Sequence, residues 1–183
     1  MINGSDTPKE ERDCARTPDW LFRWCDKYLG PYDVDLAASK ENAKCRRFYS
    51  GKRGNDALIR GWADDYPGGH GFLNPPYSDL SPWMAKAAEE VANAFCTTMV
   101  IPCFNGEGWS EWYAHAELVI NIIGRVNFWR PDGTEMKGNP RGTCIALFAP
   151  RIPLVVRGMF ELGEYDVGRV VYIQRDDMRL EIS

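Results

Sequence analysis

The sequence predicts an α/β protein with a mostly parallel sheet and an antiparallel pair of strands near its C-terminal end. As far as residue 116, short apolar segments typical of strands alternate with amphipathic segments typical of helices. This alternation is characteristic of parallel strands that are joined by helical crossovers. After residue 118, strand-like segments follow one another closely, and this spacing favours the antiparallel pair.

Length and composition predict one soluble globular domain. The chain has 183 residues, of which 44% are hydrophobic and 26% charged, enough for a sizeable core. We expect a cytoplasmic protein, because no apolar run approaches the roughly 20 residues of a membrane span and the first ten residues do not resemble a signal peptide. The six cysteines are scattered and there are only two histidines, which suits neither a metal site nor a disulfide framework.

The first predicted helix begins at a residue pair typical of helix starts. Thr17 is expected to be the N-cap, and Pro18 takes the first helical position. Apolar residues recur at helical spacing from Trp20 to Tyr28, and Gly30, followed by proline, ends the helix. Residues 1–16 are polar, and we expect them to be a poorly ordered segment before a single domain at 17–183.

Strands and helices follow in alternation along the rest of the chain. A strand is predicted at residues 32–36, after which Ser39 can cap a short helix from Lys40. Residues 71–73 have the pattern of a short buried strand, and a second long helix begins at Ser81. Further strands are predicted at residues 97–101, 118–123, 126–129, 143–148, 154–156 and 170–173, a helix at 109–116, and a loop at 130–142.

The stretch from Gly71 to Tyr77 carries the strongest chemical signal. Asn74 is followed by Pro75 and Pro76, and each proline restricts both its own backbone and that of the residue before it. The side-chain amide of Asn74 and the carbonyl of Pro75 can then accept hydrogen bonds from one planar amino group. Tyr77 offers a ring that can stack on the molecule carrying that group. The four residues form an Asn-Pro-Pro-Tyr motif, typical of methyltransferases that act on amino groups.

Polar residues follow the predicted strands at the edge where α/β sheets bind ligands. Asp35, Asn74 and the loop of residues 102–105 all come at the carboxyl ends of strands. Asp35 can bind a ribose hydroxyl or an ammonium group, although an aspartate at a turn is an equally good interpretation of this residue alone. The glycine patterns of dinucleotide and ATP sites are absent from the sequence.

Two basic segments interrupt an acidic chain with a net charge of −4. Between residues 44 and 60 there are six basic residues and one acid, and between residues 125 and 151 there are five basic residues and two acids. Such segments are compatible with phosphate contacts on one face of the protein, or with an ordinary solvated surface.

The order of the motifs resembles that of the small phage-type N6-adenine DNA methyltransferases, the Dam-like family, from Thr17 to Phe148. Six segments carry the resemblance: TPDW at 17–20, DVDLAAS at 33–39, DAL at 56–58 before Trp62, FLNPPYS at 72–78 with Trp83 and Lys86 on the next helix, MVIP at 99–102 and GRVNF at 124–128. One departure is that Ala37, Ala38 and Ser39 stand where larger methyltransferases have a glycine-rich loop.

The resemblance implies a Rossmann-like class I fold that binds S-adenosylmethionine (SAM) and methylates N6 of adenine in double-stranded DNA after base flipping. GATC as the target is suggested by the family name alone. The implied catalytic residues are Asn74, Pro75, Pro76 and Tyr77. The implied SAM-binding residues are Thr17, Pro18, Trp20, Asp35, Ala37, Ser39, Asp56 and Asn74. The expected DNA-binding residues are Arg46, Arg47, Ser78, Arg125, Arg130, Lys137 and Arg141, with target recognition by loops and no metal involved.

Two alternatives stay open from the sequence. One is a SAM-dependent methyltransferase that acts on RNA adenine or on a protein glutamine, since the same four-residue motif occurs in those enzymes. The other is a catalytically inactive protein that only binds nucleic acid, against which the intact motif and Asp35 argue.

Overall fold

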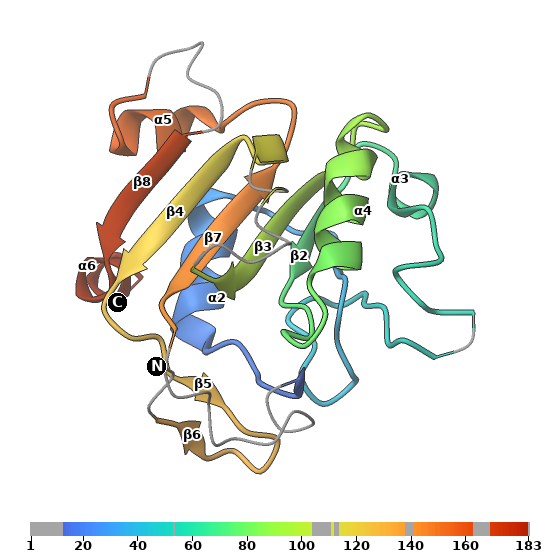
Figure 1. Ribbon diagram of the computed structural model, residues 1–183, viewed down its shortest axis with the longest axis horizontal. Coiled ribbons are helices and arrows are strands. Elements are labelled where there is room, and N and C mark those ends of the chain that lie inside the picture. Colours follow the sequence, from blue (N-terminus) through green and yellow to red (C-terminus); the bar gives the residue numbers. More distant parts are fainter. Residues whose placement is uncertain are drawn as a thin grey trace.

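A six-stranded sheet forms the centre of the molecule (Figure 1). The computed structural model describes residues 13–52, 54–103, 111, 114–137, 141–162 and 169–182. The sheet contains β1 Val34–Asp35, β2 His70–Leu73, β3 Cys96–Pro102, β4 Leu118–Ile123, β7 Thr143–Phe148 and β8 Arg169–Gln174. Their order is β1-β2-β3-β7-β4-β8, and β7 alone among them is antiparallel to its neighbours. The predicted α/β architecture with a mostly parallel sheet is therefore confirmed.

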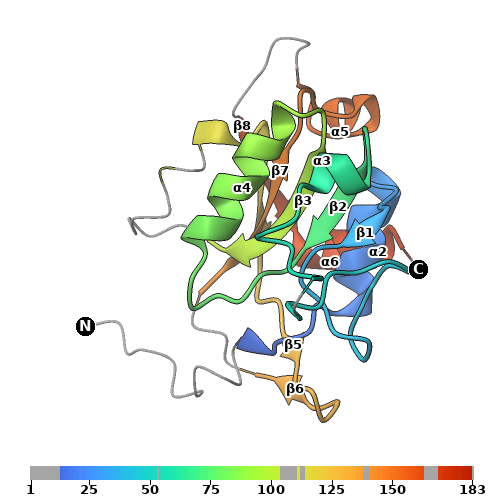
Figure 2. The ribbon, with the colours of Figure 1, turned by 90° about the vertical axis from the view of Figure 1, so that its right-hand side faces the viewer.

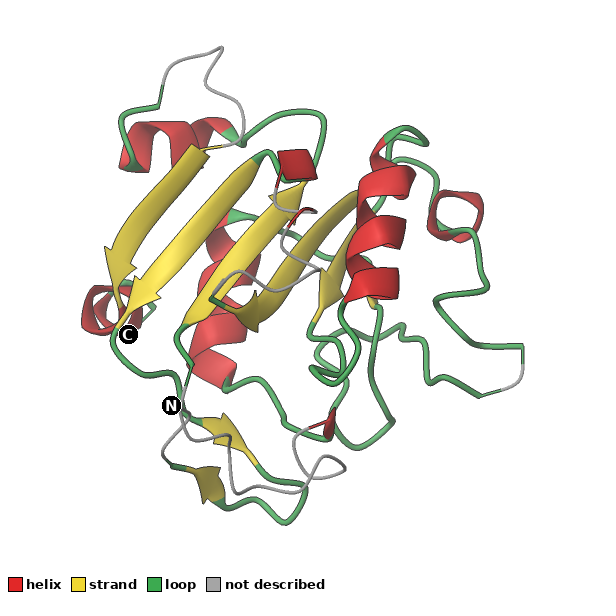
Figure 3. Ribbon diagram, in the orientation of Figure 1, coloured by secondary structure: helices red, strands yellow, loops and turns green. Residues whose placement is uncertain are grey.

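Helices cover both faces of this sheet, giving three layers (Figure 2). They are α2 Asp19–Tyr28, α3 Trp62–Asp65, α4 Ser81–Val91, α5 Leu154–Met159 and α6 Arg175–Leu180. Buried residues of α2, α5 and α6 form one core cluster with the sheet, and those of α3 and α4 form the other. A separate antiparallel pair, β5 Phe128–Trp129 and β6 Glu135–Met136, lies below the sheet (Figure 3).

Helix α2 packs on the sheet through the apolar stripe that the sequence predicts. Leu21, Trp24, Cys25 and Tyr28 are its buried residues, and they recur at the spacing of one helix face. The helix begins one residue later than expected, at Asp19, so the N-cap is not the predicted threonine but the proline after it, whose extended backbone provides no side-chain cap bond. The helix start is thus shifted by one position, as is common at helix ends.

The short helix α3 was not predicted from the sequence, because its stability depends on a distant residue. Glu90 of α4 accepts hydrogen bonds from the backbone N–H groups of Trp62, at 2.9 Å, and Ala63, at 3.1 Å. A carboxylate in this position satisfies the free N–H groups of the first turn. Lys86 pairs with Glu90 at 3.0 Å and lies over the ring of Trp62, which gives this lysine of the motif region a structural role.

Three local predictions are wrong. Residues 154–156 belong to helix α5 and not to a strand, because Val156 is buried in the core and the Pro153 carbonyl accepts the first helical hydrogen bonds. Lys40 begins a turn and not a helix. Residues 126–129 contribute only the two residues of β5, and β6 lies in the predicted loop at 130–142. The predicted helix at 109–116 falls largely outside the described residues.

The parallel strands place their carboxyl ends at the edge of the sheet that faces β5 and β6 (Figure 1). β1 and β2 pair in parallel with Asp35 opposite Phe72, so Asp35 and Asn74 both come at this edge. β3 is parallel to β2 and ends nearby at Pro102. The sheet therefore brings together segments that are far apart in the sequence, at the position where open α/β sheets bind their ligands.

Candidate active site

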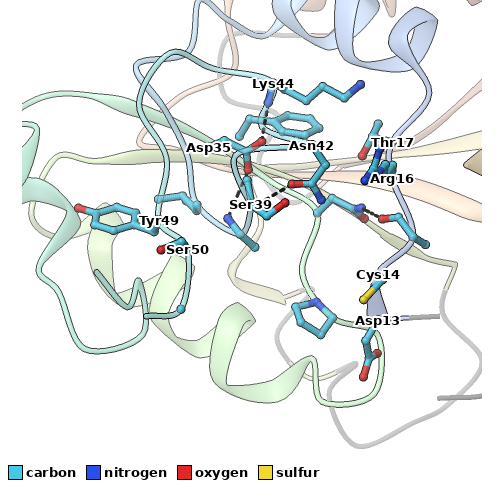
Figure 4. Close-up of a pocket in the computed structure, with 18 of the residues that line it drawn as sticks. Asp13, Cys14, Arg16, Thr17, Asp35, Ser39, Asn42, Lys44, Tyr49 and Ser50 are labelled. Atoms are coloured by element: carbon cyan, nitrogen blue, oxygen red, sulfur yellow. Dashed lines mark hydrogen bonds between the residues drawn. The ribbon is translucent and has the colours of Figure 1, made fainter. Parts of the chain in front are cut away.

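A cavity of about 410 Å³ opens at the carboxyl ends of β1 and β2 (Figure 4). Its size lies in the range of small-molecule binding sites. The predicted residues that line it are Thr17, Asp35, Ala37, Ser39, Asn74 and Pro76. Trp83, named above with the motif, lines it too, as do residues that the sequence did not single out, including Arg16, Asn42, Lys44, Tyr49 and Ser50.

Asn74 presents an unused acceptor at this cavity. Its Nδ2 group donates a 2.9 Å hydrogen bond to the carbonyl oxygen of Ala15. Its Oδ1 atom is buried and has no hydrogen-bond partner within the described chain. A buried, unpaired amide oxygen costs on the order of 1–3 kcal/mol, so such an atom in a ligand-sized cavity indicates a hydrogen bond that a ligand completes.

The residues after Asn74 form a rigid turn, and the ring of Tyr77 in this turn packs against other residues of the protein. Pro75 is buried, and none of the hydrogen bonds among described residues is accepted by its carbonyl oxygen. Tyr77 is half-buried and does not line the cavity, contrary to the expectation of a projecting ring. It packs edge-to-face on Phe128, with ring centroids 6.0 Å apart, and its hydroxyl donates to the Val100 carbonyl at 3.3 Å. Burial raises the pKa of Tyr77 well above its ordinary value, so the hydroxyl stays protonated.

Asp35 shapes the wall of the cavity through hydrogen bonds that its side chain accepts from the backbone of the loop that follows it. It is only 3% exposed, and its carboxylate accepts the N–H groups of Lys44, at 2.9 Å, and Ala37, at 3.3 Å. Burial raises the pKa of Asp35, and these two hydrogen bonds lower it in part. Lys44 turns its ammonium group to Asp19 at the start of α2. Asp35 thus fixes the loop that follows β1, and residues of this loop line the cavity.

That loop contains a tight turn in place of the predicted helix. The backbone N–H of Ser39 donates to the side chain of Asn42 at 2.6 Å, and the Ser39 hydroxyl accepts the Glu41 N–H at 3.3 Å. Farther along the chain, Tyr49 is buried and Ser50 lies beside it, on the side of the cavity away from Arg16 and Thr17 (Figure 4). Serine and asparagine favour such turns because their side chains bond to nearby backbone, a signal available in the sequence.

The structure does not bring Trp20 and Asp56 to the cavity. The ring of Trp20 lies 5.0 Å from the guanidinium of Arg179 in α6, away from the cavity lining. Asp56 caps a turn, since its carboxylate accepts the Leu58 N–H at 3.0 Å. Pro18 is buried at the start of α2 and also lies outside the lining. Aspartate commonly stabilises a turn by accepting the backbone N–H two residues later, and Asp56 does so here.

The predicted DNA-binding residues occupy two different regions. Arg46 and Arg47 are exposed on the loop after β1, and Arg47 lies 5.6 Å from the ring centroid of Tyr66. The remaining five are on or next to the Asn-Pro-Pro-Tyr turn and the β5–β6 region: Ser78, Arg125, Arg130, Lys137 and Arg141. Arg130 donates to the backbone carbonyl of Glu135 at 3.0 Å and thereby connects β5 to β6. The seven residues thus come from separate segments of the chain, and the loop before Arg46 lines one cavity together with Arg130.

A second cavity, of about 770 Å³, adjoins the first and opens toward β5. The two cavities share the lining residues Arg16, Thr17, Asn42 and Lys44. Arg23 and Arg130 also line the second cavity, together with the acids Asp19 and Glu41. Its basic residues thus outnumber its acidic ones in a chain whose net charge is −4.

Neither a cluster of metal-binding side chains nor a membrane-spanning helix occurs among the described residues. No group of three or more histidine, cysteine, aspartate or glutamate side chains among them is arranged to bind a metal ion. None of the helices they form is both long and apolar enough to cross a membrane.

Comparison with known proteins adds independent evidence. Residues 4–179 match the family model described as DNA N-6-adenine-methyltransferase (Dam). The chain is 35% identical over 187 residues to a DNA N-6-adenine-methyltransferase of Escherichia phage T1, with 93% of this chain and 72% of the relative covered. It is 26% identical over 160 residues to a protein of the same description from Haemophilus phage HP1 (strain HP1c1), with 84% and 88% covered.

A shorter match involves a putative methyltransferase, YfdM, of Escherichia coli (strain K12). It is 36% identical over 77 residues, which cover 41% of this chain and 78% of the relative. No solved structure matches the chain. Because the family match extends over nearly the whole sequence and includes the Asn-Pro-Pro-Tyr turn, the chain belongs to the Dam family of DNA N-6-adenine-methyltransferases.

Proposed function

We propose that the protein transfers a methyl group from SAM to N6 of adenine in double-stranded DNA. The observation that carries the proposal is the position of Asn74 Oδ1, which is buried, unpaired and at a ligand-sized cavity. Family membership supports adenine as the acceptor, and both phage relatives are described as DNA N-6-adenine-methyltransferases.

The residues of the cavity suit a cofactor with an amino-acid end and a nucleoside end. Thr17 and Arg16 provide polar atoms on one side, and Tyr49 and Ser50 provide an aromatic ring and a hydroxyl on the other (Figure 4). Asp35 and Ala37 also line the cavity. SAM, when bound, supplies an already activated methyl group.

Asn74 and Pro75 prepare the amino group of the target base. The lone pair of adenine N6 is delocalised into the ring, so the nitrogen is a poor nucleophile. Asn74 Oδ1 and the Pro75 carbonyl can each accept one N6–H, which favours a pyramidal nitrogen with its lone pair directed away from both acceptors. Because these acceptors are held by a rigid turn, they act with little reorganisation as charge develops on the nitrogen.

The target base must leave the duplex to reach Asn74 in the lining of the cavity, so we propose base flipping. Tyr77 supports the turn from behind through its contacts with Phe128 and Val100, and Trp83 and Pro76 line the cavity itself. We assign phosphate contacts to the basic residues near β5 and β6. Arg130 lines the second cavity, and the exposed Lys137 directly follows β6.

A methyl-transfer assay with labelled SAM tests this function. Unmethylated duplex DNA, RNA and an unmodified protein extract are offered as separate substrates, and digestion of the DNA product identifies the methylated base. We expect label in N6-methyladenine of the duplex DNA. Mapping the labelled sites tests GATC as target. Label in RNA adenine or in protein glutamine would establish one of the alternative substrates, and no label in any substrate would support a protein that only binds nucleic acid.

A further inference from the structure

Residues 13–16, which we call the clasp, connect the catalytic turn to the β5–β6 pair. The Ala15 carbonyl accepts the side-chain Nδ2 of Asn74 at 2.9 Å. Asp13 Oδ1 accepts the backbone N–H of Ser78 at 3.0 Å. Arg16 forms an antiparallel bridge with Trp129 of β5, through backbone hydrogen bonds of 2.8 and 3.0 Å. Three of the four residues of the clasp thus contact both ends of the Asn-Pro-Pro-Tyr turn and the hairpin beyond it.

The contact with Ala15 decides which way the Asn74 amide faces. A backbone carbonyl can only accept hydrogen bonds, so the NH₂ group of Asn74 must face it. The Oδ1 atom is therefore left as the acceptor for a ligand, which agrees with its being unpaired. With the amide reversed, two acceptor oxygens would meet and Asn74 would present a donor to the amino group. The clasp consequently selects the orientation that the chemistry needs.

The turn needs this external support because of its own composition. Pro75 and Pro76 have no N–H groups, so they cannot close the turn by donating hydrogen bonds. Tyr77 has the first backbone N–H after the prolines, and the next one, that of Ser78, is the N–H that Asp13 accepts. A charged acceptor makes this hydrogen bond stronger than a neutral one would. Asp13 therefore holds the C-terminal end of the turn, while Ala15 holds the side chain at the N-terminal end.

We infer that Asp13 is a positioning residue for methyl transfer. Its carboxylate keeps the clasp against the turn, and the clasp in turn keeps Asn74 Oδ1 directed at the amino group. The inference rests on the proposed function of Asn74. Asp13 also lines the cavity, but its carboxylate bonds the Ser78 N–H and not Asn74 Oδ1, so its removal should lower the rate of the chemical step more than it lowers SAM affinity.

Kinetics of the full-length protein test this role. In Asp13→Ala we expect the single-turnover rate to fall roughly 10- to 100-fold, as for a small displacement of a reacting group. The KM for DNA should stay within about twofold, and the KM for SAM, whose proposed cavity Asp13 lines, should change several-fold less than the rate. Asp13→Asn keeps a side-chain oxygen that can accept the Ser78 N–H, and it should recover most of the rate. Asp79→Ala is the matched control. Asp79 is exposed and follows Ser78 directly, and its substitution removes the same charge as Asp13→Ala.

Amide NMR tests the clasp without any activity. The Asn74 side-chain NH₂ signals are assigned as the pair missing from Asn74→Ala, and their hydrogen exchange should be slower in the wild type and in Asp13→Asn than in Asp13→Ala. Equal exchange and equal rates in wild type and Asp13→Ala would overturn the inference, as would an Asp13→Asn protein as slow as Asp13→Ala. If Asn74→Ala itself retained the wild-type rate, the proposed function of Asn74 would fail, whatever the exchange data show for the clasp.

Discussion

The carboxylate of Asp35 accepts the backbone N–H of Lys44 at 2.9 Å and so closes the loop between them. The loop forms one wall of the cavity, which means that this aspartate acts on the site through backbone geometry as well as through its charge. Because Asp35 is buried, a water molecule cannot simply replace its oxygen atoms as acceptors.

SAM affinity should therefore depend on Asp35. We expect Asp35→Ala to weaken SAM binding at least tenfold, which is about 1.4 kcal/mol, because a charge-assisted hydrogen bond and the loop conformation are both lost. Asp35→Asn keeps one acceptor oxygen and should be intermediate. Asp56→Ala is the control, since Asp56 lies outside the cavity and should alter affinity less than threefold. Isothermal titration calorimetry measures all three, and an unchanged affinity in Asp35→Ala would contradict the assignment.

Asn74 should act on the chemical step. In Asn74→Ala we expect the single-turnover rate to fall by roughly 10²-fold or more, by analogy with the loss of one transition-state hydrogen bond. Binding of SAM and DNA should change little, because the acceptor contributes most as charge develops. Rapid-quench measurement with enzyme in excess over DNA separates the two effects. A wild-type single-turnover rate would show that the proposed mechanism is wrong.

Tyr77 should matter through its ring more than through its hydroxyl. Tyr77→Phe loses only the 3.3 Å bond to Val100, which is worth about 1 kcal/mol, and should keep much of its activity. Tyr77→Ala leaves a cavity next to Phe128, so we expect a loss of about 3 kcal/mol of unfolding free energy and most of the activity. Urea denaturation and single-turnover rates test the order. Equal damage in the two variants would assign the effect to the hydroxyl.

Salt dependence of DNA binding should identify phosphate contacts near the hairpin. Lys137 is exposed just after β6, and Lys137→Ala should reduce the slope of log K against log salt by about one. The control is Lys27→Ala, which should leave the slope unchanged. Lys27 lies in the last turn of α2 and pairs with Glu181. Fluorescence anisotropy with a labelled duplex measures both slopes. Identical slopes for wild type and Lys137→Ala would exclude this lysine from the interface.

His70 should make stability sensitive to mild acid. Burial lowers its pKa from 6.5 to about 4, and its Nε2 lies 2.9 Å from the Thr98 hydroxyl. Between these two pH values the unfolded chain binds a proton that the folded protein excludes, so stability is complete above pH 6.5 and falls as the pH approaches 4. From pH 7 to pH 5 this amounts to roughly 2 kcal/mol. Denaturation at several pH values should show a smaller decrease in His70→Gln, and an equal decrease would assign the effect to other groups.

Much of the fold and part of the site could be predicted from local patterns. The stripe of α2, the strand before Asn74 and the alternation of elements depend on apolar spacing, which a single sequence displays. Helix α5 was missed because β-branched residues favour strands, whereas burial of Val156 against the core decided for a helix. Helix α3 was missed because its first turn is capped by Glu90, 28 positions along the chain from Trp62.

The sequence by itself determined the chemistry of this protein: an amide, two prolines and an aromatic ring in consecutive positions after a buried strand. These properties are local, since two prolines restrict the backbone wherever they occur. Only the tertiary structure decided which residues serve that chemistry. Parallel pairing of β1 and β2 brought Asp35 to the same edge as Asn74, and the clasp at residues 13–16 set the direction of the Asn74 amide. Such contacts between distant segments depend on strand register and packing, which no local pattern specifies.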